Sequence, residues 1–300
     1  MSYSAASILT RPGLIRDRLT GYWELTKPRV VAMVLITALA GFYMACGTDF
    51  DLAVALRMLL GTALAAGGTL ALNEFLERDL DARMHRTRER PLPSGRLRPT
   101  EALVFGLLIA AGGIAYLYVR VNPLTASITS AITLLYLGVY TPMKRVSWLC
   151  HMVGGVPGAL PPVIGWAAAR GSLEPEAFVL FGIMLLWQLP HSLSIARLYQ
   201  SDYARAGLSL LPADRPYGNP ANAVMLTAAA MLTGFGMLPA WLGFAGRIYL
   251  AVAALLGIWM FYSTVRLVRS ATISSAARSV MFVSLIYLPA VLLVMVLDKL

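Results

Sequence analysis

The sequence predicts an all-α polytopic membrane protein with nine transmembrane helices. Of its 300 residues, 58% are hydrophobic and only 13% are charged, which is too little polar surface to cover a water-soluble globule. The apolar residues also fall into runs long enough to cross a hydrocarbon layer of about 30 Å. A third observation, the distribution of Lys and Arg along the chain, fixes the order and orientation of the spans.

Turn and charge signals divide the apolar runs into nine spans. In chain order they cover residues 28–46, 52–76, 100–119, 123–141, 148–168, 175–198, 221–243, 246–267 and 276–297. Residues 1–27 contain no apolar stretch followed by a small-residue cleavage site, so we expect a cytoplasmic N-terminal segment without a removable signal peptide. Residues 28–300 are expected to form one transmembrane domain.

The basic residues test this order, because cytoplasmic loops hold the excess of Lys and Arg. With the N-terminus inside, the inner segments contain 20 of the 25 basic residues. The outer side contains only Arg57, Arg120, Arg170, Arg247 and Lys299. This split predicts the N-terminus inside and the C-terminus outside. It also explains the net charge of +10, so we expect no nucleic-acid partner.

Residues 73–97, NEFLERDLDARMHRTRERPLPSGRL, place five acids among many arginines directly after an apolar run. Orientation explains the arginines but not the acids, since Asp and Glu contribute little to it. If the second span continues as a helix through Asp81, then Asn73, Glu77 and Asp81 share one face. Such an oxygen-only set near membrane depth suits Mg²⁺, which bridges carboxylates to substrate phosphates.

A second acid occurs on the same side of the membrane, four spans later. Asp202 follows the sixth span and is flanked by Arg197 and Arg205. It is either a further metal ligand or one partner of a plain salt bridge. The sequence leaves both interpretations open.

Ordered motifs occur along nearly the whole chain, namely LTKPRVV (25–31), NEFLERDLDARMHRT (73–87) with RPL and Gly95 after it, YTPMKR (140–145), GGVPGALPPVIGW (154–166) and WQLPH…DYARAG…LP (187–212). Together they resemble the UbiA superfamily of intramembrane prenyltransferases, in its haem-farnesylating branch. Two positions depart from the pattern of that family, because Glu77 stands where Asp is more usual and Ser192 stands where Phe is typical.

The resemblance implies Mg²⁺-dependent transfer of a farnesyl group from farnesyl diphosphate to a vinyl group of haem b. It also implies that the protein lies in the lipid of a bacterial inner membrane, with its active site facing the cytoplasm. The implied protein partners are haem A synthase or oxidase assembly factors. The implied Mg²⁺ ligands are Asn73, Glu77, Asp81 and Asp202. Cations that can take phosphate oxygens are Lys27, Arg29, Arg86, Arg90, Lys144 and Arg145.

Aromatic rings and one histidine are candidates for the haem and prenyl pocket, where π faces would stabilise a carbocation. The aromatic candidates are Tyr140, Trp166, Trp187 and Tyr199, for which an anchoring role at the membrane interface is the alternative. His191 follows Pro190, which opens the helix locally. Its imidazole could ligate haem iron, orient a haem propionate or simply pack.

Two other functions remain open from the sequence. A second UbiA-type prenyltransferase, acting on a quinone precursor or a chlorin, would share the fold and the metal site. A secondary transporter could also show intramembrane charges and broken helices. It would place those charges near the middle of its spans, whereas here the acids cluster at the cytoplasmic ends.

Overall fold

The computed structural model describes residues 12–212, 219–270 and 273–300, and these are helical throughout apart from loops and one isolated bridge between Ala245 and Lys299. Within these ranges, nine helical segments are long and apolar enough to cross a membrane, as the sequence predicts. The elements are α1 (Pro12–Leu25), α2 (Pro28–Ala45), α3 (Leu52–Asp81), α4 (Pro99–Arg120), α5 (Pro123–Leu135), η2 (Tyr136–Tyr140), α6 (Thr141–Met143), α7 (Cys150–Ala159), α8 (Pro161–Arg170), α9 (Pro175–Leu198), α10 (Gln200–Arg205), α11 (Pro220–Phe235), α12 (Leu238–Trp241), α13 (Arg247–Arg269) and α14 (Ile273–Leu297).

Several helix boundaries differ from the expected spans for local reasons. The fifth span is two helices, because Pro161 cannot continue α7 and instead begins α8. The seventh ends as α11 and the short α12, which contains Pro239. The second span continues to Asp81, the condition on which the shared face of acids depended. Helix α1, which lies within the expected N-terminal segment, was not among the predicted elements.

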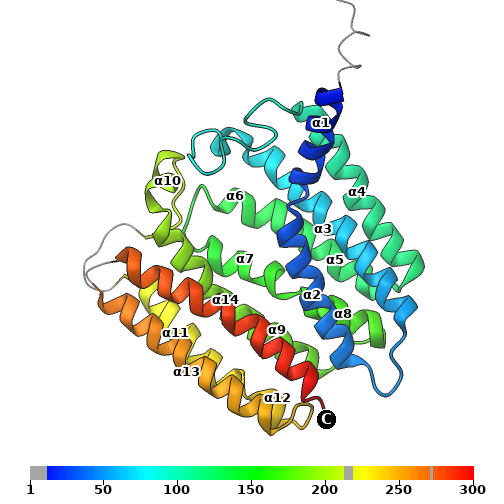
Figure 1. Cartoon of the computed structure of the whole chain (residues 1–300), viewed down its shortest axis with the longest axis vertical. Coiled ribbons are helices and arrows are strands. Elements are labelled where there is room, and N and C mark those ends of the chain that lie inside the picture. Colours follow the sequence, from blue (N-terminus) through cyan, green and yellow to red (C-terminus); the bar gives the residue numbers. More distant parts are fainter. Residues whose placement is uncertain (1–11, 213–218, 271–272) are drawn as a thin grey trace, which may run out of the picture.

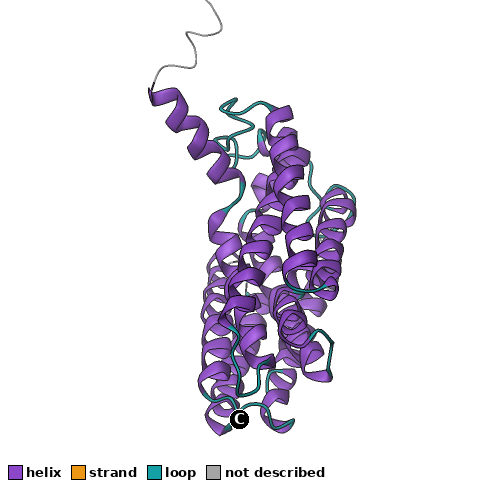
Figure 2. Ribbon diagram, turned by 90° about the vertical axis from the view of Figure 1, so that its right-hand side faces the viewer, coloured by secondary structure: helices purple, strands orange, loops and turns teal. Residues whose placement is uncertain are grey.

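The helices form two groups, which meet where α9 packs against α7 and α8 and where α14 packs against α2. The first contains α2, α3, α4, α5 and α8, and the second contains α9, α11, α13 and α14. The loop 82–98 and α10 lie at the same end of the molecule, whereas the C-terminus and α12 lie at the opposite end (Figure 1). Helix α1 leans away from the bundle at the first end (Figure 2).

The outward surface of the bundle is apolar along the spans. Leu108, Leu134 and Leu255 are 68%, 71% and 68% exposed, although each lies inside a spanning helix. A surface of this kind faces lipid rather than water, and the protein is therefore a multi-pass membrane protein. The Lys and Arg distribution still predicts which end faces the cytoplasm, although Arg11 and Arg215 lie outside the described residues.

Glycines let α3 and α4 approach closely at the end that carries the acids. A Cβ on Gly68 would come within 2.6 Å of the carbonyl oxygen of Gly106, a separation that real side chains do not adopt. Small residues allow such crossings throughout membrane bundles. The close crossing holds α3 in place, and α3 presents the acids at its inner end.

Candidate functional site

A cavity of about 310 Å³ lies at the end of the bundle that carries loop 82–98. Residues from α2, α3, η2, α9 and that loop line it. Many of the residues selected from the sequence line this one cavity, namely Lys27, Asn73, Glu77, Asp81, Arg86, Arg90, Tyr140, Lys144 and His191.

Helix α3 presents its polar face to this cavity. Asn73, Glu77 and Asp81 are all buried and line it, as their spacing along one helix face requires. The side chain of Asp79, between them in sequence, is 74% exposed. The structure therefore separates two neighbouring aspartates, one in the cavity and one in solvent.

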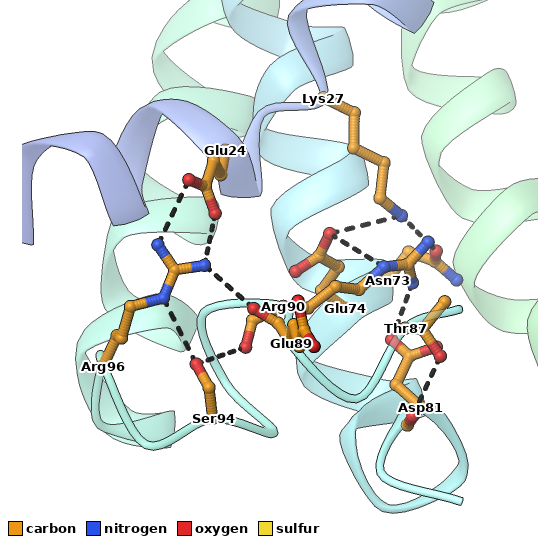
Figure 3. A network of polar contacts seen from close by, with 10 residues as sticks. All are labelled: Glu24, Lys27, Asn73, Glu74, Asp81, Thr87, Glu89, Arg90, Ser94 and Arg96. Atoms are coloured by element: carbon orange, nitrogen blue, oxygen red, sulfur yellow. Dashed lines mark hydrogen bonds and ion pairs between the residues drawn. The ribbon is translucent and has the colours of Figure 1, made fainter. Parts of the chain in front are cut away.

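Each polar group on this face contacts a cation from another segment. Lys144 Nζ lies 2.8 Å from Glu77 Oε1, and Arg90 Nη1 lies 2.7 Å from Asp81 Oδ2. Lys27 Nζ donates to Asn73 Oδ1 at 3.2 Å. Figure 3 shows Lys27 and Arg90 reaching this face of α3 from two different segments. Opposite charges meet in a buried place, where such pairs are screened least.

Glu74 is a member of this cluster that the sequence reasoning missed. Its carboxylate is buried between Lys27 Nζ at 3.7 Å and Arg90 Nε at 3.8 Å, and its second oxygen has no hydrogen-bond partner in the described residues (Figure 3). A sequence signal existed, because Glu74, Glu77 and Asp81 are spaced three and four residues apart, which is also one helix face.

Lys27 occupies an unusual backbone position at the start of α2. Its φ of 48° is left-handed, and Pro28 follows as the first helical residue. Burial, together with the nearby Arg90 guanidinium, lowers the pKa of the Lys27 ammonium to about 8. An anion at this helix start would stabilise the charged form again.

Lys144 behaves in the opposite way. Burial disfavours its ammonium, but the oxygens of Tyr140 and Tyr136 and the Glu77 carboxylate outweigh burial and raise its pKa above the ordinary value. Its Nζ also lies 4.5 Å from the centroid of the Tyr140 ring, within the range of a cation–π contact. Lys144 therefore stays charged in the cavity.

A π-helical turn, η2, brings two tyrosines to the cavity. Tyr136 and Tyr140 lie at its two ends, their ring centroids are 5.0 Å apart and both rings line the cavity. Turns of this kind occur mostly as single-turn insertions within α-helices, and they are frequent at functional sites. Sequence periodicity did not reveal η2, and Tyr136 was missed with it.

Several residues selected from the sequence do not line the cavity. Arg29 is exposed, and Arg145 reaches only the carbonyl oxygen of Leu76 from the surface. Asp202 is buried, forms an ion pair with Arg205 and does not itself line the cavity. Trp166 lies near the opposite end of the bundle, where its indole donates to Glu174.

The segment around α10 contacts the cavity rim through Arg86. The guanidinium carbon of Arg86 lies 4.6 Å from the Tyr199 ring centroid, and its Nη2 donates to the Tyr203 hydroxyl at 3.1 Å. Tyr203 lines the cavity, whereas Tyr199 does not. Arg86 thus connects loop 82–98 to the chain after α9.

Two histidines line the cavity, of which the sequence singled out one. His191 stacks on Trp187 with 4.9 Å between ring centroids. His151 was missed, and its Nε2 bonds to the carbonyl oxygen of Leu210 at 3.1 Å. His151 thereby holds the chain after α10 against α7.

The donor set of this cavity suits a hard cation. In the described part of the chain, no three His, Cys, Asp or Glu side chains come together as a metal-binding group. Two carboxylates and one amide oxygen nevertheless line the cavity from one helix face, and oxygen ligands of this type are those that Mg²⁺ prefers. Glu77, Asp81 and Asn73 therefore fit Mg²⁺ by their chemistry.

A second, apolar cavity of about 160 Å³ adjoins the first. The two cavities share Val30, Leu70 and Tyr136. From there the apolar cavity runs past successive turns of α3 to Thr62 and past α8 at Ile164. The first cavity, called the charged cavity below because carboxylates and cations line it, thus adjoins the apolar cavity along one edge.

Comparison with known proteins identifies the family. Residues 34–286 match the UbiA prenyltransferase family. The chain belongs to this family. As a UbiA family member it is a prenyltransferase, which excludes the secondary-transporter alternative.

Curated relatives in the UbiA family cover almost the whole chain. A protein named protoheme IX farnesyltransferase from Solibacter usitatus is 43% identical over 93% of this chain and 98% of its own. A protein of the same name from Koribacter versatilis is 40% identical, with 96% of each chain covered.

Solved structures agree on the UbiA fold. A structure described as digeranylgeranylglyceryl phosphate synthase matches with a TM-score of 0.79 at 18% identity, covering 94% of this chain and 98% of that one. A UbiA homolog from Archaeoglobus fulgidus, bound to DMAPP and Mg²⁺, matches with a TM-score of 0.62 at 17% identity over 91% of this chain and 99% of that one. At these identities the likeness establishes the fold alone.

Proposed function

We propose that this UbiA family member transfers a farnesyl group from farnesyl diphosphate to a vinyl group of haem b, giving haem O and diphosphate. The observation that carries the proposal is the junction of the charged cavity with the apolar cavity along Val30, Leu70 and Tyr136. A prenyl diphosphate has the same two parts, an anionic head and an apolar chain. The names of the relatives support haem as the acceptor.

The cations of the charged cavity would bind the diphosphate. Lys27, Arg90 and Lys144 line it and come from three different segments, so they can surround one anion. Arginine takes phosphate oxygens bidentately. Because charge accumulates on the leaving diphosphate as the farnesyl C1–O bond breaks, these cations would stabilise the transition state more than the bound substrate.

Asn73, Glu77 and Asp81 would hold Mg²⁺ together with the diphosphate. When bound, the ion would neutralise phosphate charge and so assist departure of the leaving group. Asp202 stays a proposed participant because the next residue, Tyr203, lines the cavity, although the Asp202 carboxylate is paired with Arg205. The proposal needs only the three groups on α3.

The reaction of the farnesyl group with haem b would be an electrophilic alkylation. The C1–O bond of farnesyl diphosphate breaks with its electrons on diphosphate, and C1 forms a bond to the terminal carbon of the vinyl group. Water then adds to the remaining carbocation and releases one proton, which gives a hydroxyethylfarnesyl side chain. The rings of Tyr136 and Tyr140 line the cavity, where their π faces would favour the cationic intermediates.

The product of the purified protein tests the proposal. We expect detergent-purified protein with haem b, farnesyl diphosphate and Mg²⁺ to yield a product whose mass equals haem b plus a farnesyl group plus a hydroxyl group. A chelator should abolish it, and added Mg²⁺ should restore it. Prenylation of a hydroxybenzoate, a quinone precursor or a chlorin, with haem b left unchanged, would instead favour the alternative UbiA-type function.

We infer further that the cavity opens to the cytoplasm of a bacterial inner membrane. The 20 to 5 split of basic residues supports this orientation. A cysteine introduced at His85 should react with a membrane-impermeant thiol reagent only from the cytoplasmic side. A cysteine introduced at Gly171 should react with the same reagent only from the outside. Labelling of position 85 from the outside would contradict the orientation.

A further inference from the structure

Helix α14 contacts His191 through a serine outside the residues discussed so far. His191 Nδ1 lies 2.7 Å from the hydroxyl oxygen of Ser284. That hydroxyl donates to the carbonyl oxygen of Met281 at 2.6 Å. A serine has one hydroxyl proton, and a carbonyl oxygen only accepts. The proton between His191 and Ser284 must therefore come from the imidazole, so Nδ1 carries the hydrogen.

Trp187 fixes the same ring from a second direction. Its indole stacks on the imidazole at an interplanar angle of 16°, and its Nε1 donates to the carbonyl oxygen of Ser284 at 2.8 Å. Ser284 thus accepts from Trp187 with its backbone and from His191 with its side chain. These contacts restrict both the plane and the rotation of the imidazole.

The remaining ring nitrogen of His191 is the chemically active one. A neutral imidazole with hydrogen on Nδ1 has its lone pair on Nε2. No residue in the described part of the chain bonds to Nε2, and the ring lines the cavity that holds the polar face of α3. Metal-ligating histidines in proteins usually donate their other N–H to a fixed acceptor, which sets the tautomer and raises the basicity of the ligating nitrogen.

We propose that Ser284 is a positioning residue that holds His191 with a free Nε2 lone pair, so that Nε2 ligates the iron of the haem substrate. The inference rests on the proposed function, since it requires haem as the acceptor. It selects iron ligation from the three roles that the sequence left open for His191. It also gives α14 a part in acceptor binding, although none of the described side chains of α14 lines the charged cavity.

Haem titration of the full-length protein in detergent, without farnesyl diphosphate, tests this assignment. His191→Ala should change the Soret band and weaken haem binding. Ser284→Ala should shift the Soret band in the same direction and weaken binding on the order of 10- to 100-fold, as loss of such partners does at metal sites. Ser284→Thr keeps the hydroxyl and should restore the parent spectrum.

Two further variants separate positioning from general damage. Thr264→Ala on α13 removes a fully buried hydroxyl that donates to the Met260 carbonyl oxygen, and it should leave the spectrum and affinity unchanged. Trp187→Phe keeps the stacked ring but loses the N–H donor, and it should produce a smaller shift in the direction of Ser284→Ala. This variant covers the case in which Ser284→Ala does not fold, which size-exclusion elution would reveal.

The outcomes distinguish the inference from the function beneath it. A changed spectrum in His191→Ala with parent spectra in Ser284→Ala and Trp187→Phe overturns the role of Ser284. Parent affinity and spectrum in His191→Ala overturns iron ligation. Absence of haem O from the parent protein in the product assay overturns the proposed function, whatever the spectra show.

Discussion

Arg90 Nη1 lies 2.7 Å from Asp81 Oδ2, and the Arg90 Nε lies 3.8 Å from Glu74 Oε1. Lys144 and Glu77 form a similar pair at 2.8 Å. The cations proposed to bind diphosphate thus neutralise the carboxylates proposed to bind Mg²⁺. When a diphosphate arrives with its metal ion, the cations would pair with the phosphates and the carboxylates with the metal. No buried charge would then be left unpaired, and an unpaired buried charge is what would cost stability.

The first prediction concerns the acids of α3. Asp81→Ala and Glu77→Ala should each lower haem O formation by about 10²-fold or more, because each removes an oxygen ligand whose metal ion assists the leaving group. The double variant should be little worse than either single one, since these groups act as a unit. Turnover of purified protein at saturating Mg²⁺ measures the effect.

Asp79 is the matched control for these variants. It lies on the same helix two residues from Asp81, but its side chain is 74% exposed. Asp79→Ala should retain parent activity. Equal losses in Asp79→Ala and Asp81→Ala would show that charge at this end of α3 matters only in a general way, and the ligand assignment would fail.

The second prediction compares two adjacent cations. Lys144 lines the cavity, whereas Arg145 is exposed and reaches only a backbone carbonyl. Lys144→Met should lower kcat/KM by about 10²-fold, as removal of one preorganised donor to developing charge does. Arg145→Met removes the same charge nearby and should stay within a factor of about two, as for exposed charges. Steady-state kinetics over farnesyl diphosphate concentration would separate them, and similar losses would refute the distinction.

Much of this arrangement could be predicted from the sequence because membrane helices follow few rules. Length and hydropathy specify the spans, and all nine were confirmed within the described residues. Helix periodicity correctly placed Asn73, Glu77 and Asp81 on one face. The sequence did not separate Lys144 from Arg145, however, because both side chains carry the same charge. Which of the two points into the cavity depends on the preceding π-helical turn η2, and hydrophobic periodicity does not reveal such a turn.

Contacts between distant helices could not be predicted either. Glu74 is in the cluster because Lys27 and Arg90 converge on it from separate segments. Ser284 lies 93 residues from His191 in sequence, and a single serine in an apolar helix has no pattern that marks it. Packing of α9 against α14, and not local sequence, creates that pair.

The third prediction concerns pH at the opposite end of the bundle. Ser172 and the Trp166 indole donate to Glu174 and lower the pKa of its carboxyl group. A carboxyl group with a lowered folded pKa contributes stability above its unfolded pKa, about 4.3 for Glu, and loses it as the pH falls from there through the folded pKa. Thermal unfolding in detergent should therefore shift to lower temperature below about pH 4.3.

Glu174→Gln removes the titrating group and should flatten that part of the profile. Glu176→Gln, two residues later at the start of α9, tests whether any carboxylate there has the same effect, and it should leave the profile as in the parent. A parent-like acid transition in Glu174→Gln would show that the contacts of Glu174 do not control stability in this range.

The last prediction concerns the far end of the apolar cavity. Thr62 lines it several helical turns from Asn73, and its hydroxyl is buried without a hydrogen-bond partner in the described residues. Thr62→Trp should fill that end of the cavity. Relative to the parent, the variant should therefore prefer the shorter geranyl diphosphate over farnesyl diphosphate by about 10-fold or more, as expected when a hydrophobic pocket loses room for part of a chain.

Thr62→Val is nearly the same size and removes only the unpaired hydroxyl, so it should keep the parent preference and be at least as stable. Competition between the two diphosphates, read by product mass, measures the ratio. An unchanged ratio in Thr62→Trp, with the protein still folded, would place the prenyl chain elsewhere.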